Sequence, residues 1–181
     1  MRVVAQEWMS LDGYASGPSG EDEIFAAVPE AADAASQRWN EALLDDVDLV
    51  LLGRTTYDAF VRFWPESDEP IAARVNAISK TVCSRSLSTA WWGSFTPARV
   101  ERDAVSYVRG LREGTTGTVL VWGSLSLVHQ LVEAGELDEL DLFVAPVTLG
   151  AGTPLLPSAV RLRQLGAEPF PGALHVRYAL D

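Results

Sequence analysis

The chain has 181 residues, of which 48% are hydrophobic and 22% charged, and its formal charge is −11. This length suits one well-packed core, so we expect a single domain over residues 1–181. The negative charge argues against general nucleic-acid binding, and no apolar run approaches the roughly 20 residues that span a bilayer. The first residues lack the apolar core of a secretion signal, and Cys83 is the only cysteine, so we expect a cytoplasmic protein.

The first part of the chain predicts a strand, a long loop and a helix. Residues 2–9 alternate partly and predict the strand, and the Gly-, Ser- and Pro-rich residues 10–20 predict the loop. Long loops of this kind commonly carry function. Apolar residues at every fourth position predict a helix over residues 29–45, namely Ala31, Ala35, Trp39 and Leu43.

The rest of the chain alternates between strand and helix patterns. Short apolar runs predict strands buried on both faces at residues 49–52, 80–84, 118–122 and 140–147. Helical spacing of apolar residues follows the first three of them, at Tyr57 to Trp64 before Pro65, at Val100, Ala104, Val108 and Leu111, and at Leu127, Val128, Leu131 and Val132. This order predicts an α/β fold with a central, mostly parallel sheet and helices on both faces. Residues 160–168 and 174–180 predict a C-terminal antiparallel hairpin.

The turn after residues 49–52 carries a positive charge at the start of a helix. Ligands of open α/β sheets bind outside the carboxyl ends of the strands, where the helices begin. Gly53 permits close approach of the backbone, and the planar guanidinium of Arg54 matches a phosphate. Thr55 or Thr56 is the predicted helix cap, and Asp58 completes a capping box with Thr55. An ordinary surface ion pair between Arg54 and Asp58 is the alternative.

A second turn has similar chemistry. Gly123 and Ser124 follow residues 118–122 at a predicted helix N-terminus, where unpaired N–H groups and the positive end of the helix dipole favour an anion. Either turn alone could be an ordinary turn with a serine cap, but together they favour a phosphate-bearing ligand. The glycine fingerprint of dinucleotide folds and the Walker motif are absent. Leu127 occupies the place of the second glycine of a nucleophile elbow, which leaves a hydrolase as a weak alternative.

Five motifs in register resemble the dihydrofolate reductase-like family: SLDGYA, LLGRTTYD, VCSRSL, VWGSLSLVHQLVEAGELDEL and LFVAPVTLGAGTPLL. They are most similar to the reductase domain of the bifunctional riboflavin-biosynthesis deaminase/reductase and its stand-alone relatives, and they cover nearly the whole chain. The resemblance implies a mostly parallel sheet of about eight strands, NADPH as the hydride donor, and often a homodimer.

The resemblance also implies roles for individual residues. Gly53, Arg54 and Thr55 would meet the cofactor phosphates, with Arg54 on the 2′-phosphate or the pyrophosphate. The adenosine end would lie against Ser84 and Arg85, and the pyrophosphate against Gly123 and Ser124. Trp122 stands where the family commonly has another glycine. Ser10, Leu11 and Asp12 match the loop that flanks the nicotinamide and the substrate.

The implied reaction is hydride transfer from NADPH to a C=N or C=O carbon of a small heterocyclic or carbonyl substrate, with a proton delivered to the heteroatom. Asp12 is the predicted catalytic residue because it lies in the matching loop motif, although an Asp before Gly13 is equally a turn former. His129 and His175 are the only histidines and have no partners at ligand spacing, so no metal site is expected. The alternative function is a nucleotide-binding module that kept the NADPH cleft and lost catalysis.

Overall fold

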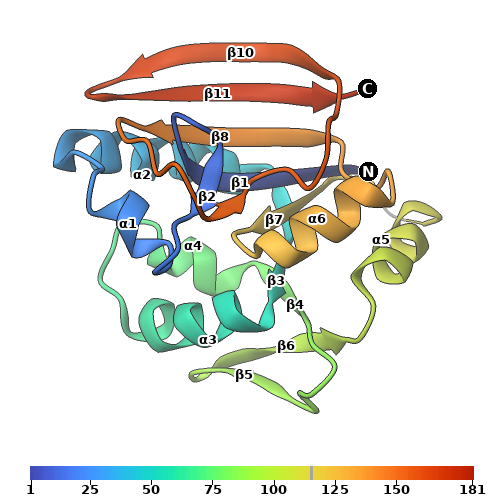
Figure 1. Cartoon of the computed structure of the whole chain (residues 1–181). Coiled ribbons are helices and arrows are strands. Elements are labelled where there is room, and N and C mark those ends of the chain that lie inside the picture. The colour runs from blue at the N-terminus through green and yellow to red at the C-terminus, as the bar shows by residue number, and fades with distance from the viewer. Residues whose placement is uncertain (115) are drawn as a thin grey trace.

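A nine-stranded sheet forms the centre of the computed structural model, which describes residues 1–114 and 116–181 (Figure 1). The strands run across the sheet in the order β10-β11-β8-β1-β7-β3-β4-β6-β5. Their bounds are β1 Arg2–Ser10, β3 Val47–Gly53, β4 Ser79–Cys83, β5 Ala90–Trp92, β6 Phe95–Glu101, β7 Thr118–Trp122, β8 Glu139–Ala145, β10 Leu162–Phe170 and β11 Ala173–Leu180. A separate two-stranded sheet pairs β2 (Tyr14–Ser16) with β9 (Thr153–Pro154).

The centre of the sheet is parallel. β1 pairs in parallel with β7 and β8, β3 with β7 and β4, and β4 with β6. The C-terminal strands β10 and β11 form an antiparallel hairpin that joins the sheet at β8 and occupies its upper edge in Figure 1. The predicted α/β fold and its C-terminal hairpin are therefore confirmed, with nine strands where the resemblance implied about eight.

Helices cover both faces of the sheet. Their bounds are α1 Asp22–Phe25, α2 Glu30–Asp45, α3 Arg54–Phe63, the 3₁₀ turn η1 Trp64–Glu66, α4 Ala72–Ala77, α5 Ala104–Arg112 and α6 Leu125–Glu133. α5 and α6 pack on one face, and α2, α3 and α4 pack on the other. Neighbouring residues of a strand point to opposite faces of the sheet. Leu51 thus packs with α6, whereas Leu52 packs with α3 and α4. No helix in the described part of the chain is long and apolar enough to cross a membrane.

The helix predicted around Val100 begins later than expected. Val100 belongs to β6, and α5 starts at Ala104 after Asp103, whose carboxylate accepts a hydrogen bond from Ser106 N at 2.9 Å. The error arose because Val100 precedes Ala104 by four positions and so continued the helical spacing by coincidence. Strand β6 was missed for this reason, and the short strand β5 before it was not predicted either.

Helix α2 was predicted correctly, but its buried face is offset from the predicted stripe. Ala31 is exposed, whereas the buried positions are Ala32, Ala35, Ser36, Asn40 and Leu44. Two of these are polar, and a hydrophobic pattern does not detect them. Both line the cavity described below.

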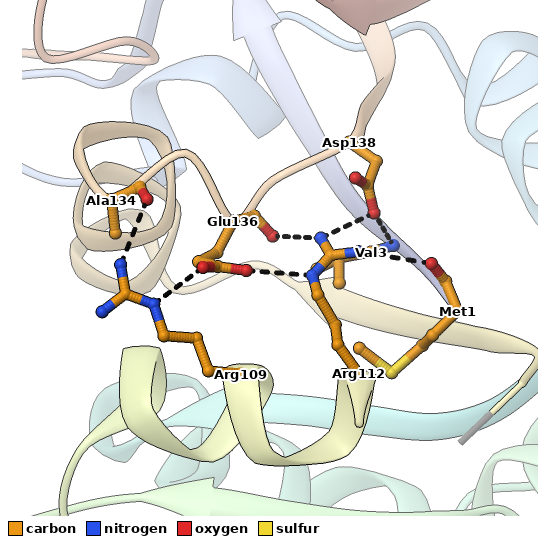
Figure 2. A network of polar contacts seen from close by, with 7 residues as sticks. All are labelled: Met1, Val3, Arg109, Arg112, Ala134, Glu136 and Asp138. Atoms are coloured by element: carbon orange, nitrogen blue, oxygen red, sulfur yellow. Dashed lines mark hydrogen bonds and ion pairs between the residues drawn. The ribbon is translucent and has the colours of Figure 1, made fainter. Parts of the chain in front are cut away.

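Arg112 at the end of α5 holds the N-terminal strand and the segment before β8 together (Figure 2). Its guanidinium donates to the carboxylates of Glu136 and Asp138, both at 2.9 Å, and to the carbonyl oxygens of Glu136 at 3.0 Å and Met1 at 3.3 Å. Asp138 also accepts from Val3 N at 2.7 Å. The neighbouring Arg109 shares Glu136 but is more exposed.

Arg112→Met is expected to lower the free energy of unfolding by about 1.5 to 3 kcal/mol, the value of hydrogen bonds to charged groups. Arg109→Met is the matched control and should cost less than about 1 kcal/mol, because its ion pair is exposed and screened. Urea denaturation of the three proteins measures both effects. Equal losses for the two variants would contradict this account of the network.

Candidate functional site

One large cavity opens at the carboxyl ends of the parallel strands. Its volume is about 1060 Å³, and it is lined from β1, from the starts of α3 and α6, and from the segments after β4 and β6. Ligands of open α/β sheets bind in this position. The cavity contains all seven residues that the sequence assigned to the cofactor: Gly53, Arg54, Thr55, Ser84, Arg85, Gly123 and Ser124.

A chain of hydrogen bonds joins the two predicted phosphate turns. Gly53 N donates to Ser124 Oγ at 2.7 Å, and Ser124 Oγ donates to Thr56 Oγ1 at 2.8 Å. Gly123 and Ser124 both have positive φ angles, of 63° and 71°, so two successive residues adopt the left-handed conformation. This conformation is unfavourable for serine, and its hydrogen bonds to the first turn hold it in place.

The same turns hold the first amides of two helices at the cavity, although Gly53 N and Gly123 N are already paired with Ser124 Oγ and Gln6 O. α3 begins at Arg54 and α6 at Leu125, and the N–H groups of a first helical turn have no acceptor within the helix. A Cβ atom at Gly123 would lie 3.1 Å from Thr56 Cγ2, which accounts for glycine at that position. The two helix N-termini therefore converge on one cavity, as an anion site requires.

The predicted capping of α3 is wrong. Gly53 occupies the cap position, and no side chain caps the helix. Thr56 is engaged by Ser124, and Asp58 accepts from Arg54 Nε at 2.6 Å instead of completing a capping box with Thr55. The ion pair considered as the alternative for Arg54 therefore forms.

Three arginines line one end of the cavity. Arg54, Arg85 and Arg102 follow β3, β4 and β6, which are neighbours in the sheet, and all three are exposed. The Arg54–Asp58 pair is exposed and uses only Nε of the guanidinium, so it leaves the Nη groups for a ligand. Ser84 is buried, and its hydroxyl accepts from Ser86 N and Leu87 N, so it shapes the loop that presents Arg85.

The three residues predicted to flank the substrate, Ser10 to Asp12, are not among those that line the cavity, although Ala15, Ser16 and Gly20 farther along the same loop are. Ser10 is fully buried and Leu11 is 69% exposed. The Asp12 carboxylate accepts from Ser10 Oγ at 2.6 Å and from the backbone amides of Leu149 and Gly150. These hydrogen bonds lower the pKa of Asp12 to about 2, with the Ser10 hydroxyl making the largest contribution. The structure thus places Asp12 as the anchor of the loop after β8.

Glu7 is the carboxyl group that the sequence analysis missed. It lies in β1, one residue after Gln6, whose carbonyl accepts from Gly123 N at 3.3 Å, and it lines the cavity. Its Oε1 atom is buried and has no hydrogen-bond partner among the described residues. Burial raises the pKa of Glu7 from 4.5 to about 8, with a smaller contribution from the charge of Glu21. The available signal was a pair of polar residues, Gln6 and Glu7, within an otherwise apolar first strand.

Aromatic side chains form part of the cavity wall. Trp122 stacks on Trp64 with ring centroids 5.9 Å apart and meets Phe60 edge-on at 5.4 Å. The large residue that replaces the expected glycine before Gly123 is therefore packed against the helix side of the cavity. No group of three or more potential metal ligands was found in residues 1–114 and 116–181.

The chain matches a known protein family over nearly its whole length. The RibD C-terminal domain family matches residues 2–176. The chain belongs to this family. The chain is 22% identical to the uncharacterized protein YyaP of Bacillus subtilis (strain 168) over an alignment of 184 residues. This alignment covers 93% of the chain and 89% of YyaP.

Solved structures agree with this assignment at the level of fold. A proposed riboflavin biosynthesis protein from Shewanella sp. PV-4 matches with a TM-score of 0.79 and 19% identity, covering 100% of this chain and 99% of that one. Dihydrofolate reductase from Enterococcus faecalis, in complex with NADP(H), matches with a TM-score of 0.65 and 12% identity, covering 99% and 96% of the two chains. The resemblance inferred from the motifs is confirmed, and RibD C-terminal domain membership supports a reductase-like role.

Proposed function

We propose that the protein is an NADPH-dependent reductase that transfers a hydride to a C=N or C=O carbon of a small heterocyclic or carbonyl substrate. The observation that carries this proposal is one cavity that combines two features. The first is a pair of helix N-termini with three guanidinium groups at one end, and the second is a carboxyl group of raised pKa, that of Glu7, in the lining. The first arrangement suits a polyanionic dinucleotide, and the second suits proton delivery near neutral pH.

The residues present fit the cofactor. Gly123 N already donates to Gln6 O, so the donors offered here are Ser124 N of the left-handed turn and the first amides of α3 and α6. We assign the phosphates of NADPH to Gly53, Arg54, Thr55, Gly123 and Ser124, and its adenosine end to Ser84 and Arg85. Local positive charge at this end offsets the net charge of −11 for an anionic ligand.

When bound, NADPH supplies the hydride. The chain itself positions the reactants, excludes water and provides the proton. Glu7 holds that proton at a carboxyl group near neutral pH, whereas Asp12, with a pKa of about 2, is ionised and has no proton to donate. Asp12 serves instead by fixing the loop of Leu149 and Gly150.

Cofactor binding and turnover together test the proposal. NADPH at about 100 times its dissociation constant is expected to raise the free energy of unfolding by about 2.7 kcal/mol, seen as a thermal shift. Addition of pyrimidines, dihydropterins or carbonyl compounds should then reduce the absorbance of NADPH. The absence of a shift with NADPH and NADH would count against the cofactor site. A shift without turnover of any substrate would favour the non-catalytic binding module.

Arg54→Ala is expected to weaken NADPH binding by roughly tenfold to a hundredfold, because a charged hydrogen bond of about 1.5 to 3 kcal/mol is lost. The preference for NADPH over NADH should fall with it if Arg54 meets the 2′-phosphate. Arg62→Ala is the matched control, because Arg62 is exposed on the same helix and lies outside the cavity lining. Titration calorimetry of both variants measures the effect. If Arg54→Ala and Arg62→Ala bind NADPH equally well, Arg54 serves only its surface ion pair with Asp58.

The resemblance also favours a homodimer that acts in the cytoplasm. Sedimentation measurements and fractionation of cells would test these two expectations.

A further inference from the structure

A buried polar cluster adjoins the cavity and has no part in the reaction proposed above. Its centre is Asp141 of β8, whose side chain is 3% exposed. Asp141 Oδ1 accepts from Gln6 Nε2 at 3.1 Å, and Asp141 Oδ2 accepts from Trp39 Nε1 at 3.0 Å. Gln6 lies on β1 and lines the cavity, and Trp39 lies on α2. One carboxylate therefore ties together two elements that border the cavity.

His175 of β11 completes the cluster. Its side chain is 1% exposed, and its Nε2 atom lies 3.2 Å from Asp141 Oδ1. Its Nδ1 atom lies 3.1 Å from Oε1 of Glu168, which is directly opposite His175 in the hairpin of β10 and β11. The two-residue turn at 171–172 sets this register. Each ring nitrogen of His175 thus faces a carboxylate oxygen.

This arrangement favours a proton on both nitrogens of the His175 ring. A neutral imidazole has one N–H group and one lone pair, so one nitrogen would face its carboxylate lone pair to lone pair. Both oxygens of Asp141 already accept N–H groups, as a carboxylate does. Glu168 is 50% exposed, so water supports its charge. A doubly protonated ring gives each carboxylate a charged donor.

The surroundings of the His175 ring also suit a cation. Its centroid lies 4.0 Å from the Trp39 ring, 5.0 Å from the Phe143 ring and 5.4 Å from the Phe170 ring. The faces of aromatic rings attract cations. α2 and β1 contribute the uncharged Trp39 and Gln6 to the cluster. Charged side chains come from β8, β10 and β11, namely Asp141, Glu168 and Arg177, whose guanidinium lies 5.4 Å from the Trp39 ring.

We propose that His175 is a positioning residue of the reductase site, an inference whose catalytic part rests on the proposed function. As an imidazolium it balances the charge of Asp141 and holds this carboxylate where it fixes Gln6 and Trp39. Gln6 directly precedes Glu7 in β1, so the cluster determines where the proposed proton donor lies. Without the imidazolium, Asp141 would be a buried charge with no counter-charge.

Nitrogen-15 NMR of the full chain labelled at histidine tests the proton directly. The chain has only two histidines, so His175→Gln assigns the ring signals of His175. Both of its ring nitrogens are expected to give the protonated signal at neutral pH. Glu168→Gln should lose one of these protons at a lower pH than the natural chain, because an amide donates to Nδ1 and replaces it. One unprotonated ring nitrogen at neutral pH in the natural chain overturns the proposal.

The indole N–H signal of Trp39 reports the position of Asp141. His175→Phe keeps a ring but removes both donors, whereas His175→Gln keeps one donor for Asp141. The Trp39 signal is expected to shift and to exchange faster with water in His175→Phe, and to return toward its natural position in His175→Gln. Circular dichroism shows that both variants fold, and Glu168→Gln reads the cluster from a half-exposed position. An unchanged Trp39 signal in a folded His175→Phe variant counts against the positioning role.

Kinetics with whichever pyrimidine, dihydropterin or carbonyl compound is reduced connect the cluster with the reaction. His175→Phe is expected to lower kcat about tenfold through misplacement of the reacting groups, and His175→Gln to restore most of it. NADPH affinity should stay within about twofold, because β8 is three or more steps in the sheet from the strands that precede the arginines. His129→Gln is the control, because His129 lies on α6 outside the cavity lining.

An unchanged kcat in His175→Phe overturns the positioning role, and so does a loss that His175→Gln leaves in place. The NMR signals need no substrate, so they separate this proposal from the reductase assignment. A chain that shows both ring protons and the expected Trp39 shift but reduces no compound keeps the cluster and loses the proposed reaction. A chain that reduces a compound with one unprotonated ring nitrogen does the reverse.

Discussion

Glu7→Gln is expected to be more stable than the natural chain above neutral pH. The folded-state pKa of Glu7 is about 8 and the ordinary value is 4.5, so between these values the folded protein holds a proton that the unfolded chain has released. Stability therefore falls as the pH rises through this window, and it is unaffected by Glu7 below it. At about 1.36 kcal/mol per pKa unit the full loss is at most about 5 kcal/mol, and water that reaches this half-buried side chain reduces it.

The measurement is the midpoint of thermal unfolding for both proteins, from about pH 4 to about pH 9. The two curves should coincide at the acidic end and separate progressively toward pH 8, because glutamine has no proton to lose. Glu133→Gln, on α6 and outside the cavity lining, serves as the control and should follow the natural chain. Parallel curves for Glu7→Gln and the natural protein would remove the evidence for a buried carboxyl group.

The same variant connects stability with function. A residue that destabilises the folded state at the pH where the protein works is retained for a reason other than folding. We expect Glu7→Gln to gain stability and to lose turnover of the reductase reaction, while NADPH affinity changes little. An equally active and more stable variant would move the proton source elsewhere.

Asp141→Ala is expected to cost about 3 to 5 kcal/mol of unfolding free energy, because it removes the acceptor at the centre of a buried network. The Asp141 carboxylate is 3% exposed and accepts from Gln6 Nε2 at 3.1 Å and from Trp39 Nε1 at 3.0 Å. His175 Nε2 lies 3.2 Å from it, and His175 Nδ1 lies 3.1 Å from Glu168. Without Asp141 these buried groups would lose their common partner.

Urea denaturation measures this loss. Asp141→Asn keeps one carbonyl acceptor and should cost less than the alanine variant, and Asp68→Ala at an exposed position should be nearly neutral. A change below about 1 kcal/mol for Asp141→Ala would show that water replaces the carboxylate without penalty. The hydrogen bond from Trp39 to Asp141 also ties α2 to β8.

The parallel core was predictable because burial on both faces leaves a direct trace in sequence. Runs such as Leu49 to Leu52 contain no alternation, and the apolar residues after them recur at helical spacing. β6 was not predictable in this way, because it is mostly exposed and carries Pro97 and Arg99. Its alternation is too weak to separate it from the spacing of α5.

The site was predictable where backbone chemistry determines it and not where side chains from distant segments meet. The glycines and the arginine at strand ends predicted an anion site from local features alone. Asp12 was chosen for its place in a motif, but its pKa is lowered first by the Ser10 hydroxyl and then by amides 137 and 138 residues away. The polar pair Gln6 and Glu7 marks this strand in the sequence, but the missing hydrogen-bond partner of Glu7 Oε1 exists only in the folded cavity.

The sequence by itself determined the parallel core with its C-terminal hairpin, the family, and the two turns suited to phosphate, because their patterns lie in neighbouring residues. Only the tertiary structure decided which charges share a cavity, since sheet order differs from chain order. It brings the arginines together after β3, β4 and β6 and leaves Glu7 on β1. The physical reason is that pKa values, unpaired acceptors and charge separation depend on burial and on long-range contacts.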